Sequence, residues 1–246
     1  MKPIIVIKVG TSTLLDSAET PSVVFEQVAS SIATVSAEYR VVLVTSGAIG
    51  FGVAQTGLAE RPTEVADLQA LAMIGQVGLL RRWREALEGT SIGQVLVTRS
   101  DLEHEAQRES FTRSLKRLWD YDALPIVNEN DAVSSEEITF GDNDQLAAQI
   151  AVALGAQKLV LLTDQDGIQE NFGTDNQARL EMVSIHDIEN HIAPVQSKFG
   201  KGGASSKVLA AHQALKGGVE VYIAHAVLPR VIEQALSGKS GTKVVQ

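Results

Sequence analysis

Six short apolar runs, rich in β-branched residues, recur along the chain, and longer amphipathic stretches separate them. Most of the runs are continuously apolar, which is typical of strands covered on both faces of a parallel sheet. This alternation predicts an α/β fold, a three-layer sandwich with a mainly parallel central sheet and right-handed crossovers. We expect strands at 4–9, 41–46, 94–98, 124–128, 159–163 and 219–224, and helices at 22–38, 64–88, 104–120, 143–154, 203–216 and 228–237.

Two segments interrupt this rhythm. Residues 132–140 and 167–183 have the pattern of hairpins or excursions at the edge of the sheet. No Pro/Ser-rich linker and no internal repeat divides the chain, so we expect residues 1–246 to form a single domain.

Charge and residue usage exclude several classes of function. The chain has 30 Asp+Glu against 21 Lys+Arg, and such an acidic surface repels nucleic-acid backbones. It has no cysteine, which excludes disulfides and thiolate nucleophiles and fits a reducing compartment. It also lacks an apolar run of membrane-spanning length. We therefore expect a cytoplasmic protein that binds neither nucleic acid nor membrane.

Polar residues and glycines stand at the carboxyl ends of four of the predicted strands, at 8–12, 45–48, 128–131 and 163–167. Ligands of open parallel sheets bind at the carboxyl ends of the strands, so these residues are candidates for a binding site. Lys8 stands near the end of an apolar strand, where a buried ammonium needs an anion or a carboxylate. A structural salt bridge is the alternative interpretation.

Residues 10–12 offer backbone N–H groups to a phosphate, although a tight turn after an edge strand would have the same sequence. Neither a P-loop nor the dinucleotide fingerprint G-x-G-x-x-G is present. The missing fingerprint argues against an NAD enzyme built on a parallel sheet.

Two further segments carry binding chemistry. Residues 141–144 read GDND at the start of a predicted helix, which is either simple N-capping or a cluster that orients substrate and lysine side chains. Residues 200–207 read GKGGASSK and also lead into a helix, as expected of a phosphate cradle. A flexible surface loop with a serine N-cap is the alternative for this second segment.

The combination of these motifs, in order and spacing, resembles the amino acid kinase family. The resemblance rests on residues 6–12, 44–52, 124–133, 140–151, 159–168 and 200–211, and it spans essentially the whole chain. The runs VTSGAI, IVNEND and GDND are most similar to the members of the family that act on L-glutamate.

The resemblance implies ATP-dependent phosphorylation of the L-glutamate side-chain carboxylate to L-glutamyl 5-phosphate, the first step of proline biosynthesis. It also implies Mg²⁺ bound to the ATP phosphates, a homodimer or homotetramer, and glutamyl phosphate reductase as a partner enzyme. Many members of the family add a PUA domain, and we expect residues 1–246 to be the catalytic domain without one.

Residue roles follow from the same resemblance. It implies that Lys8 and Lys207 contact the transferred phosphoryl group and that Asp144 holds both lysines in place, while direct metal ligands are left open. It assigns the acceptor site to Ser46, Gly47, Ala48, Asn128, Asp131 and Asn143. It assigns the nucleotide site to Lys8, Gly10, Thr163, Asp164, Lys201, Gly202, Gly203, Ala204, Ser205, Ser206 and Lys207.

Elementary chemistry agrees with these roles, because a carboxylate nucleophile is already ionised at neutral pH and needs no general base. Catalysis then requires alignment and charge neutralisation. The chain departs from the family pattern at Lys201, Ala204 and Ser206 of the late loop and at Gln169, where an aromatic residue is usual. The alternatives are an acetylglutamate kinase or UMP kinase activity, or a non-catalytic regulatory module with the same fold.

Overall fold

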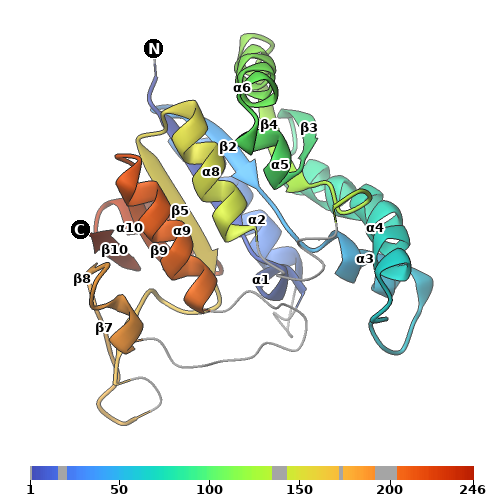
Figure 1. Ribbon diagram of the computed structural model, residues 1–246. Helices are drawn as coiled ribbons and strands as arrows, with labels where there is room; N and C mark the ends of the chain where they lie inside the picture. Colours follow the sequence, from blue (N-terminus) through green and yellow to red (C-terminus); the bar gives the residue numbers. More distant parts are fainter. Residues whose placement is uncertain (1, 16–20, 135–142, 172–173, 192–203) are drawn as a thin grey trace.

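The computed structural model describes residues 2–15, 21–134, 143–171, 174–191 and 204–246 (Figure 1). Within them, eight strands form a central sheet in the order β3-β4-β2-β1-β5-β9-β10-β8. Neighbouring strands pair in parallel except β9 and β10, so the predicted mainly parallel sheet is confirmed. The strands are β1 (Ile4–Val9), β2 (Arg40–Val44), β3 (Ser91–Val97), β4 (Ala123–Glu129), β5 (Lys158–Thr163), β8 (Met182–Ser184), β9 (Glu220–His225) and β10 (Thr242–Val245).

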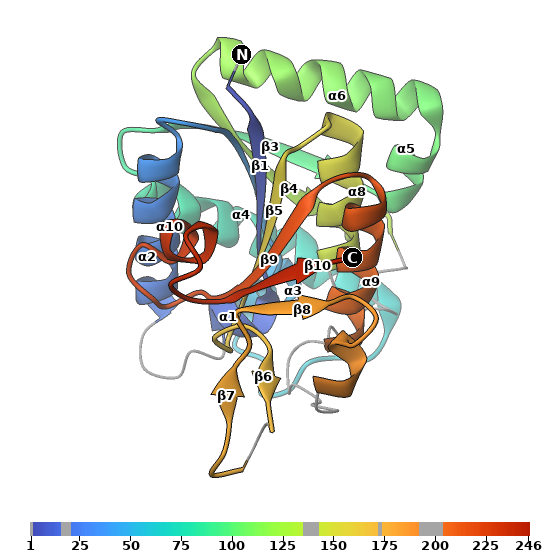
Figure 2. The same ribbon diagram turned by 90° about the vertical axis from the view of Figure 1, so that its left-hand side faces the viewer.

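Helices cover both faces of this sheet and complete the predicted three layers (Figure 2). One face packs against α2 (Pro21–Val35), α4 (Val65–Ala86) and α10 (Val231–Leu236). The other face packs against α6 (Glu105–Asp120), α8 (Asp144–Leu154) and α9 (Ala204–Lys216). Each of these six helices was expected from the periodicity. The last one begins at Val231, three residues later than predicted, because Arg230 before it has a left-handed backbone conformation with φ of 53°.

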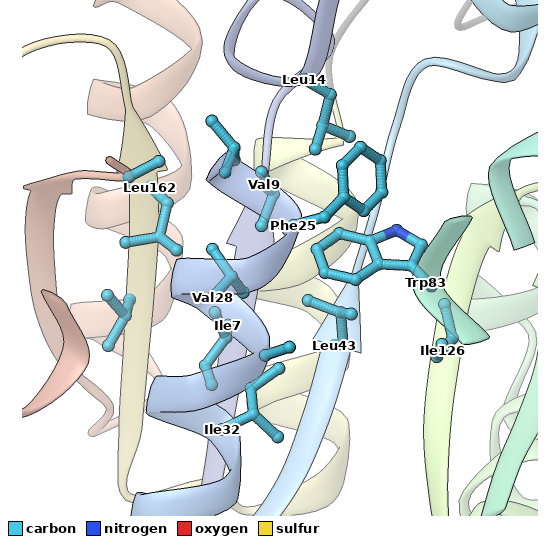
Figure 3. Packing of buried hydrophobic residues seen from close by; sticks show 14 of the residues in the cluster. Ile7, Val9, Leu14, Phe25, Val28, Ile32, Leu43, Trp83, Ile126 and Leu162 are labelled. Atoms are coloured by element: carbon cyan, nitrogen blue, oxygen red, sulfur yellow. The ribbon is translucent and has the colours of Figure 1, made fainter. Parts of the chain in front are cut away.

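The core between α2, α4 and the sheet centres on Trp83, which is fully buried (Figure 3). Its ring packs on Phe25 of α2 with 4.5 Å between ring centroids. The indole Nε1 donates a hydrogen bond to Thr45 Oγ1 at 2.9 Å, just beyond the end of β2. A buried indole needs such a partner, so the largest core side chain of α4 also fixes the helix against the end of a strand.

Several short elements were not predicted. They are α1 (Thr11–Leu15), α3 (Ala48–Thr56), α5 (Arg99–Glu103), the 3₁₀ helix η1 (Ile188–His191), β8 and β10. The sequence of α3 contains glycines, which weaken helix propensity. Its packing explains them: a Cβ at Gly52 would lie 2.0 Å from Leu71 O, and one at Gly75 would lie 1.9 Å from Ala48 O. The glycines allow the backbones of α3 and α4 to touch.

The two expected excursions have different outcomes. Segment 167–183 contains the antiparallel pair β6 (Gln169–Glu170) and β7 (Ala178–Arg179), as predicted, but its end enters the central sheet as β8. Most of segment 132–140 lies outside the described residues. The interpretation of residues 10–12 as a turn after an edge strand is wrong, because β1 lies between β2 and β5 and α1 begins directly at Thr11. Among the described residues, none of the helices has the length and apolar character of a membrane span.

Candidate active site at the carboxyl ends of the strands

A buried carboxylate joins two lysines from different elements. Lys8, near the end of β1, is 1% exposed and its Nζ lies 2.6 Å from Asp144 Oδ1. Lys207, in the first turn of α9, places its Nζ 3.0 Å from Asp144 Oδ2. Asp144 is the first residue of α8 and is fully buried. The structure therefore brings together the three residues to which the family resemblance assigns the chemical step.

The local structure explains how this carboxylate tolerates burial. Asp144 stands at a helix N-terminus, where the helix dipole favours negative charge, and Ser206 Oγ donates to its Oδ2 at 3.1 Å. Burying ions costs desolvation energy, so such a cluster is weak evidence for stability alone. The trio has one more positive than negative group, which suits a bound anion. Gly10 leaves space beside the ammonium, because a Cβ there would lie 3.2 Å from Lys8 Nζ.

A network of amides lies beside this cluster. Asn143, the residue before α8, donates from Nδ2 to Thr45 O at 2.6 Å and to Asn128 Oδ1 at 2.7 Å. Asn128 Oδ1 also accepts from the backbone N–H of Glu129 at 3.0 Å, and Asn128 Nδ2 donates to Gln76 Oε1 at 2.8 Å. Asn143 makes no side-chain capping bond, so the N-capping interpretation is wrong for this residue. Its amide instead joins the ends of β2 and β4.

The segment after β2 presents a hydroxyl at the same edge of the sheet. The strand ends at Val44, two residues earlier than predicted, and Ser46 follows it with 2% exposure. Within the described residues, Ser46 Oγ has no hydrogen-bond partner. Gly47 has φ of 101°, a conformation that favours glycine, and Ala48 begins α3. A buried hydroxyl without a protein partner is suited to hydrogen-bond a ligand.

Two buried carboxylates stand at the end of β4. Asp131 is 6% exposed and Glu129 is 2% exposed. Burial raises the pKa of Glu129 from 4.5 to about 7, and the nearby Asp131 carboxylate adds to the rise, while Ser134 and Arg99 oppose it. Arg99 also donates from Nη1 to Gln145 Oε1 at 3.1 Å, which links this end of β4 to the first turn of α8.

The raised pKa of Glu129 makes stability depend on pH. An acid whose pKa is higher in the folded state stabilises the fold fully below its unfolded value, and this stabilisation is lost as pH rises from 4.5 to about 7. Glu129→Gln removes this dependence. We expect the variant to gain stability relative to wild type between about pH 5 and pH 8, by at most ~3 kcal/mol. Urea unfolding of both proteins at pH 5 and pH 8 measures the free energy of unfolding. A difference between variant and wild type that stays constant with pH would contradict the raised pKa.

The residues assigned to the nucleotide are only partly described. Thr163 is the last residue of β5, which pairs with β1, and Asp164 follows it. Thr163 Oγ1 donates to Asp164 Oδ1 at 3.0 Å. Ser205 is exposed in the first turn of α9, which begins at Ala204. Lys201, Gly202 and Gly203 lie outside the described residues.

Two residues of this site, Gln76 and Glu129, were not predicted from the sequence, and both hydrogen-bond to Asn128. Glu129 is the last residue of β4 and stands inside the polar run 128–131 at the end of this buried strand, and that position was a usable signal. Gln76 had no such signal, because it lies 52 positions before its partner Asn128, in the middle of an amphipathic helix.

Comparison with known proteins identifies the family. A profile of the amino acid kinase family matches residues 3–225. The chain belongs to this family. The resemblance drawn from the motifs is thus confirmed, and so is the expected fold class of an amino acid kinase.

Curated relatives within the amino acid kinase family are similar to this chain in sequence over most of its length. The chain is 40% identical over 245 residues to a glutamate 5-kinase of Symbiobacterium thermophilum, covering 96% of this chain and 92% of the relative. It is 37% identical over 228 residues to a glutamate 5-kinase of Prochlorococcus marinus strain AS9601, covering 89% of this chain. That match spans 63% of the length of the Prochlorococcus relative.

Solved structures of amino acid kinase fold superpose along the whole chain. A carbamate kinase from Giardia lamblia bound to AMP-PNP has a TM-score of 0.68 at 17% identity, covering 99% of this chain and 98% of its own. A UMP kinase from Ureaplasma parvum has a TM-score of 0.65 at 14% identity and covers all of both chains. At these identities the likeness establishes the fold.

Proposed function

We propose that the protein is a kinase that transfers the γ-phosphoryl group of ATP to the side-chain carboxylate of L-glutamate. The product is L-glutamyl 5-phosphate, and the reaction is the first step of proline biosynthesis. The observation that carries the proposal is the Lys8–Asp144–Lys207 cluster, in which Lys8 and Asp144 are buried, beside a polar acceptor region. The names of the curated relatives support the choice of glutamate.

The reaction needs charge neutralisation more than proton transfer. A carboxylate oxygen of glutamate attacks the γ-phosphorus, the bond from that phosphorus to the β–γ bridging oxygen breaks, and ADP leaves with the electron pair. Negative charge spreads over the three equatorial oxygens of the transferred group. Lys8 and Lys207 neutralise this charge, and Asp144 keeps both ammonium groups at fixed positions. The site therefore lowers the repulsion between two anionic reactants.

ATP and Mg²⁺ fit the residues that are present. An anionic polyphosphate matches the excess positive charge of the cluster, and the first turn of α9 offers the N–H groups of a helix N-terminus beside Lys207. Among the described residues, no group of three His, Cys, Asp or Glu side chains is arranged to hold a metal ion. Mg²⁺ supplies charge neutralisation on the phosphates when it is bound with ATP.

The acceptor region has groups of the right polarity for an amino acid. Ser46 supplies a hydroxyl, Asn128 and Asn143 supply amides, and Asp131 supplies a carboxylate for the α-ammonium. A carboxylate partner for the ammonium discriminates an amino acid from a simple dicarboxylate.

An acceptor panel tests the proposed function. ADP release from Mg-ATP is followed with glutamate, N-acetylglutamate, aspartate and UMP. We expect release with glutamate and background release with the other three. Release with N-acetylglutamate or UMP alone would keep the kinase chemistry and replace the substrate. No release with any acceptor, from protein that still binds ATP, would favour a non-catalytic regulatory module.

Asp131→Ala tests the acceptor site. The substitution removes a ground-state contact to the substrate ammonium, so we expect KM for glutamate to rise by about tenfold or more while KM for ATP changes little. Steady-state kinetics with each substrate varied in turn measures both constants. An unchanged KM for glutamate would make Asp131 a residue of a structural turn.

Further parts of the proposal rest on the resemblance to the family. They are a cytoplasmic location, assembly into a homodimer or homotetramer, glutamyl phosphate reductase as a partner enzyme, and residues 1–246 as the catalytic domain. Exposed apolar side chains on α4, Met73 at 55% and Val77 at 73%, support self-association.

A further inference from the structure

Helix α4 contacts the ends of two strands that carry the proposed acceptor residues. Gln76 Oε1 accepts a hydrogen bond from Asn128 Nδ2 at 2.8 Å, at the end of β4. Seven residues later, and therefore on the same face of the helix, Trp83 Nε1 donates to Thr45 Oγ1 beyond β2. The close packing of Gly75 on Ala48 O fixes this part of α4 against α3. Gln76 is thus held by a rigid helix beside the acceptor region.

The hydrogen bonds determine which atoms of the two asparagines remain for a ligand. A side-chain amide has two N–H donors and one carbonyl acceptor. Asn143 uses both donors, on Thr45 O and Asn128 Oδ1. Asn128 uses its carbonyl on Asn143 and on the backbone of Glu129, and one donor on Gln76. In the part of the chain described, this leaves the carbonyl oxygen of Asn143 and the second N–H of Asn128 without a protein partner.

A hydrogen-bond acceptor beside a donor matches the α-amino acid end of a substrate. The carbonyl of Asn143 can accept from an ammonium, and the remaining N–H of Asn128 can donate to a carboxylate. If the Asn128 amide turned over, its carbonyl would face Gln76 Oε1, and its NH₂ group would face two other donors. The hydrogen bond to Gln76 therefore helps to keep the carbonyl and NH₂ groups of the two asparagines in the orientation described above.

We propose that Gln76 is a positioning residue that fixes the Asn128–Asn143 amide pair and thereby selects an acceptor with a free α-amino acid end. The inference rests on the proposed function, and it adds the residue that sets substrate selectivity. Gln76 acts through Asn128 and has no part in the transfer of the phosphoryl group.

Two substitutions at Gln76 separate this role from general support of the fold. Gln76→Met keeps the length of the side chain and removes the acceptor, whereas Gln76→Glu keeps an acceptor oxygen. Loss of this one partly buried hydrogen bond predicts a rise in KM for glutamate of about fivefold to tenfold in Gln76→Met. We expect kcat and KM for ATP to stay within about twofold, and Gln76→Glu to recover most of the lost affinity.

Glutarate, which has both carboxylates and lacks the ammonium, tests the selectivity directly. We expect Gln76→Met to lower the ratio of kcat/KM for glutamate to that for glutarate. Gln69→Met is the matched control, because Gln69 lies seven residues earlier on α4 and its side chain makes no hydrogen bond within the described residues. It should leave every constant unchanged.

The outcomes distinguish the inference from the proposed function. Active wild-type protein with an unchanged Gln76→Met variant would overturn the inference alone. Equal losses for glutamate and ATP would assign Gln76 a structural role and overturn it as well. Wild-type protein without glutamate-dependent ADP release would overturn the proposed function, and the inference with it.

Discussion

Lys207→Ala is expected to lower the turnover number by about 100-fold or more. The lysine lies 3.0 Å from Asp144 at the start of α9, and in the proposed mechanism its charge acts on the phosphoryl group as it is transferred. A contact of this kind is strongest in the transition state, so its loss lowers kcat more than it raises KM. Single-turnover kinetics at saturating ATP and glutamate measures the effect on the chemical step.

Lys216→Ala is the matched control for this variant. Lys216 is an exposed lysine in the last turn of the same helix, far along α9 from the cluster. The control removes one positive charge from α9 without touching Asp144, and it should keep wild-type turnover. Equal turnover in Lys207→Ala and wild type would refute a role for Lys207 in the transfer.

Asp144→Ala is expected to destabilise the protein by about 3–5 kcal/mol and to abolish turnover. The substitution leaves the Lys8 ammonium buried at 1% exposure without the carboxylate 2.6 Å away. An uncompensated buried charge is costly, whereas two charges removed together leave no such charge. Urea unfolding with linear extrapolation measures the change in the free energy of unfolding.

A double variant separates this charge effect from packing. Lys8→Met combined with Asp144→Leu replaces the ion pair with apolar side chains of similar size. We expect the double variant to be inactive and yet more stable than Asp144→Ala. A double variant no more stable than Asp144→Ala would show that the loss comes from packing and not from the uncompensated charge of Lys8.

The architecture could be predicted from the sequence because strands that are buried on both faces of a sheet are continuously apolar. Runs such as 4–7 and 159–162 are apolar without interruption, and the helices between the strands repeat their apolar residues at spacings of three and four positions. Lys8 stood out for the same reason, as a charged residue in an apolar run. The elements that escaped prediction are short, and α3 contains glycines whose purpose is visible only in its contact with α4.

The site residues could be predicted where they stand at the end of a strand or the start of a helix, and could not be predicted in the middle of a helix. Asn128 and Asp131 stand at the end of a buried strand and Asn143 directly precedes a buried helix, so their polarity was conspicuous. Gln76 looks like any polar residue on a half-buried helix, and only the tertiary hydrogen bond to Asn128 reveals it. Pairings across 52 positions depend on how helices pack, which local sequence patterns do not encode.

Hydroxylamine trapping tests the central claim most directly, because hydroxylamine converts an acyl phosphate into a stable hydroxamate. The protein is incubated with Mg-ATP, hydroxylamine and glutamate, and parallel reactions contain N-acetylglutamate, aspartate or UMP. The proposed function predicts a hydroxamate with glutamate alone, formed in equal amount to ADP. ADP release with another acceptor and no hydroxamate from glutamate would contradict it.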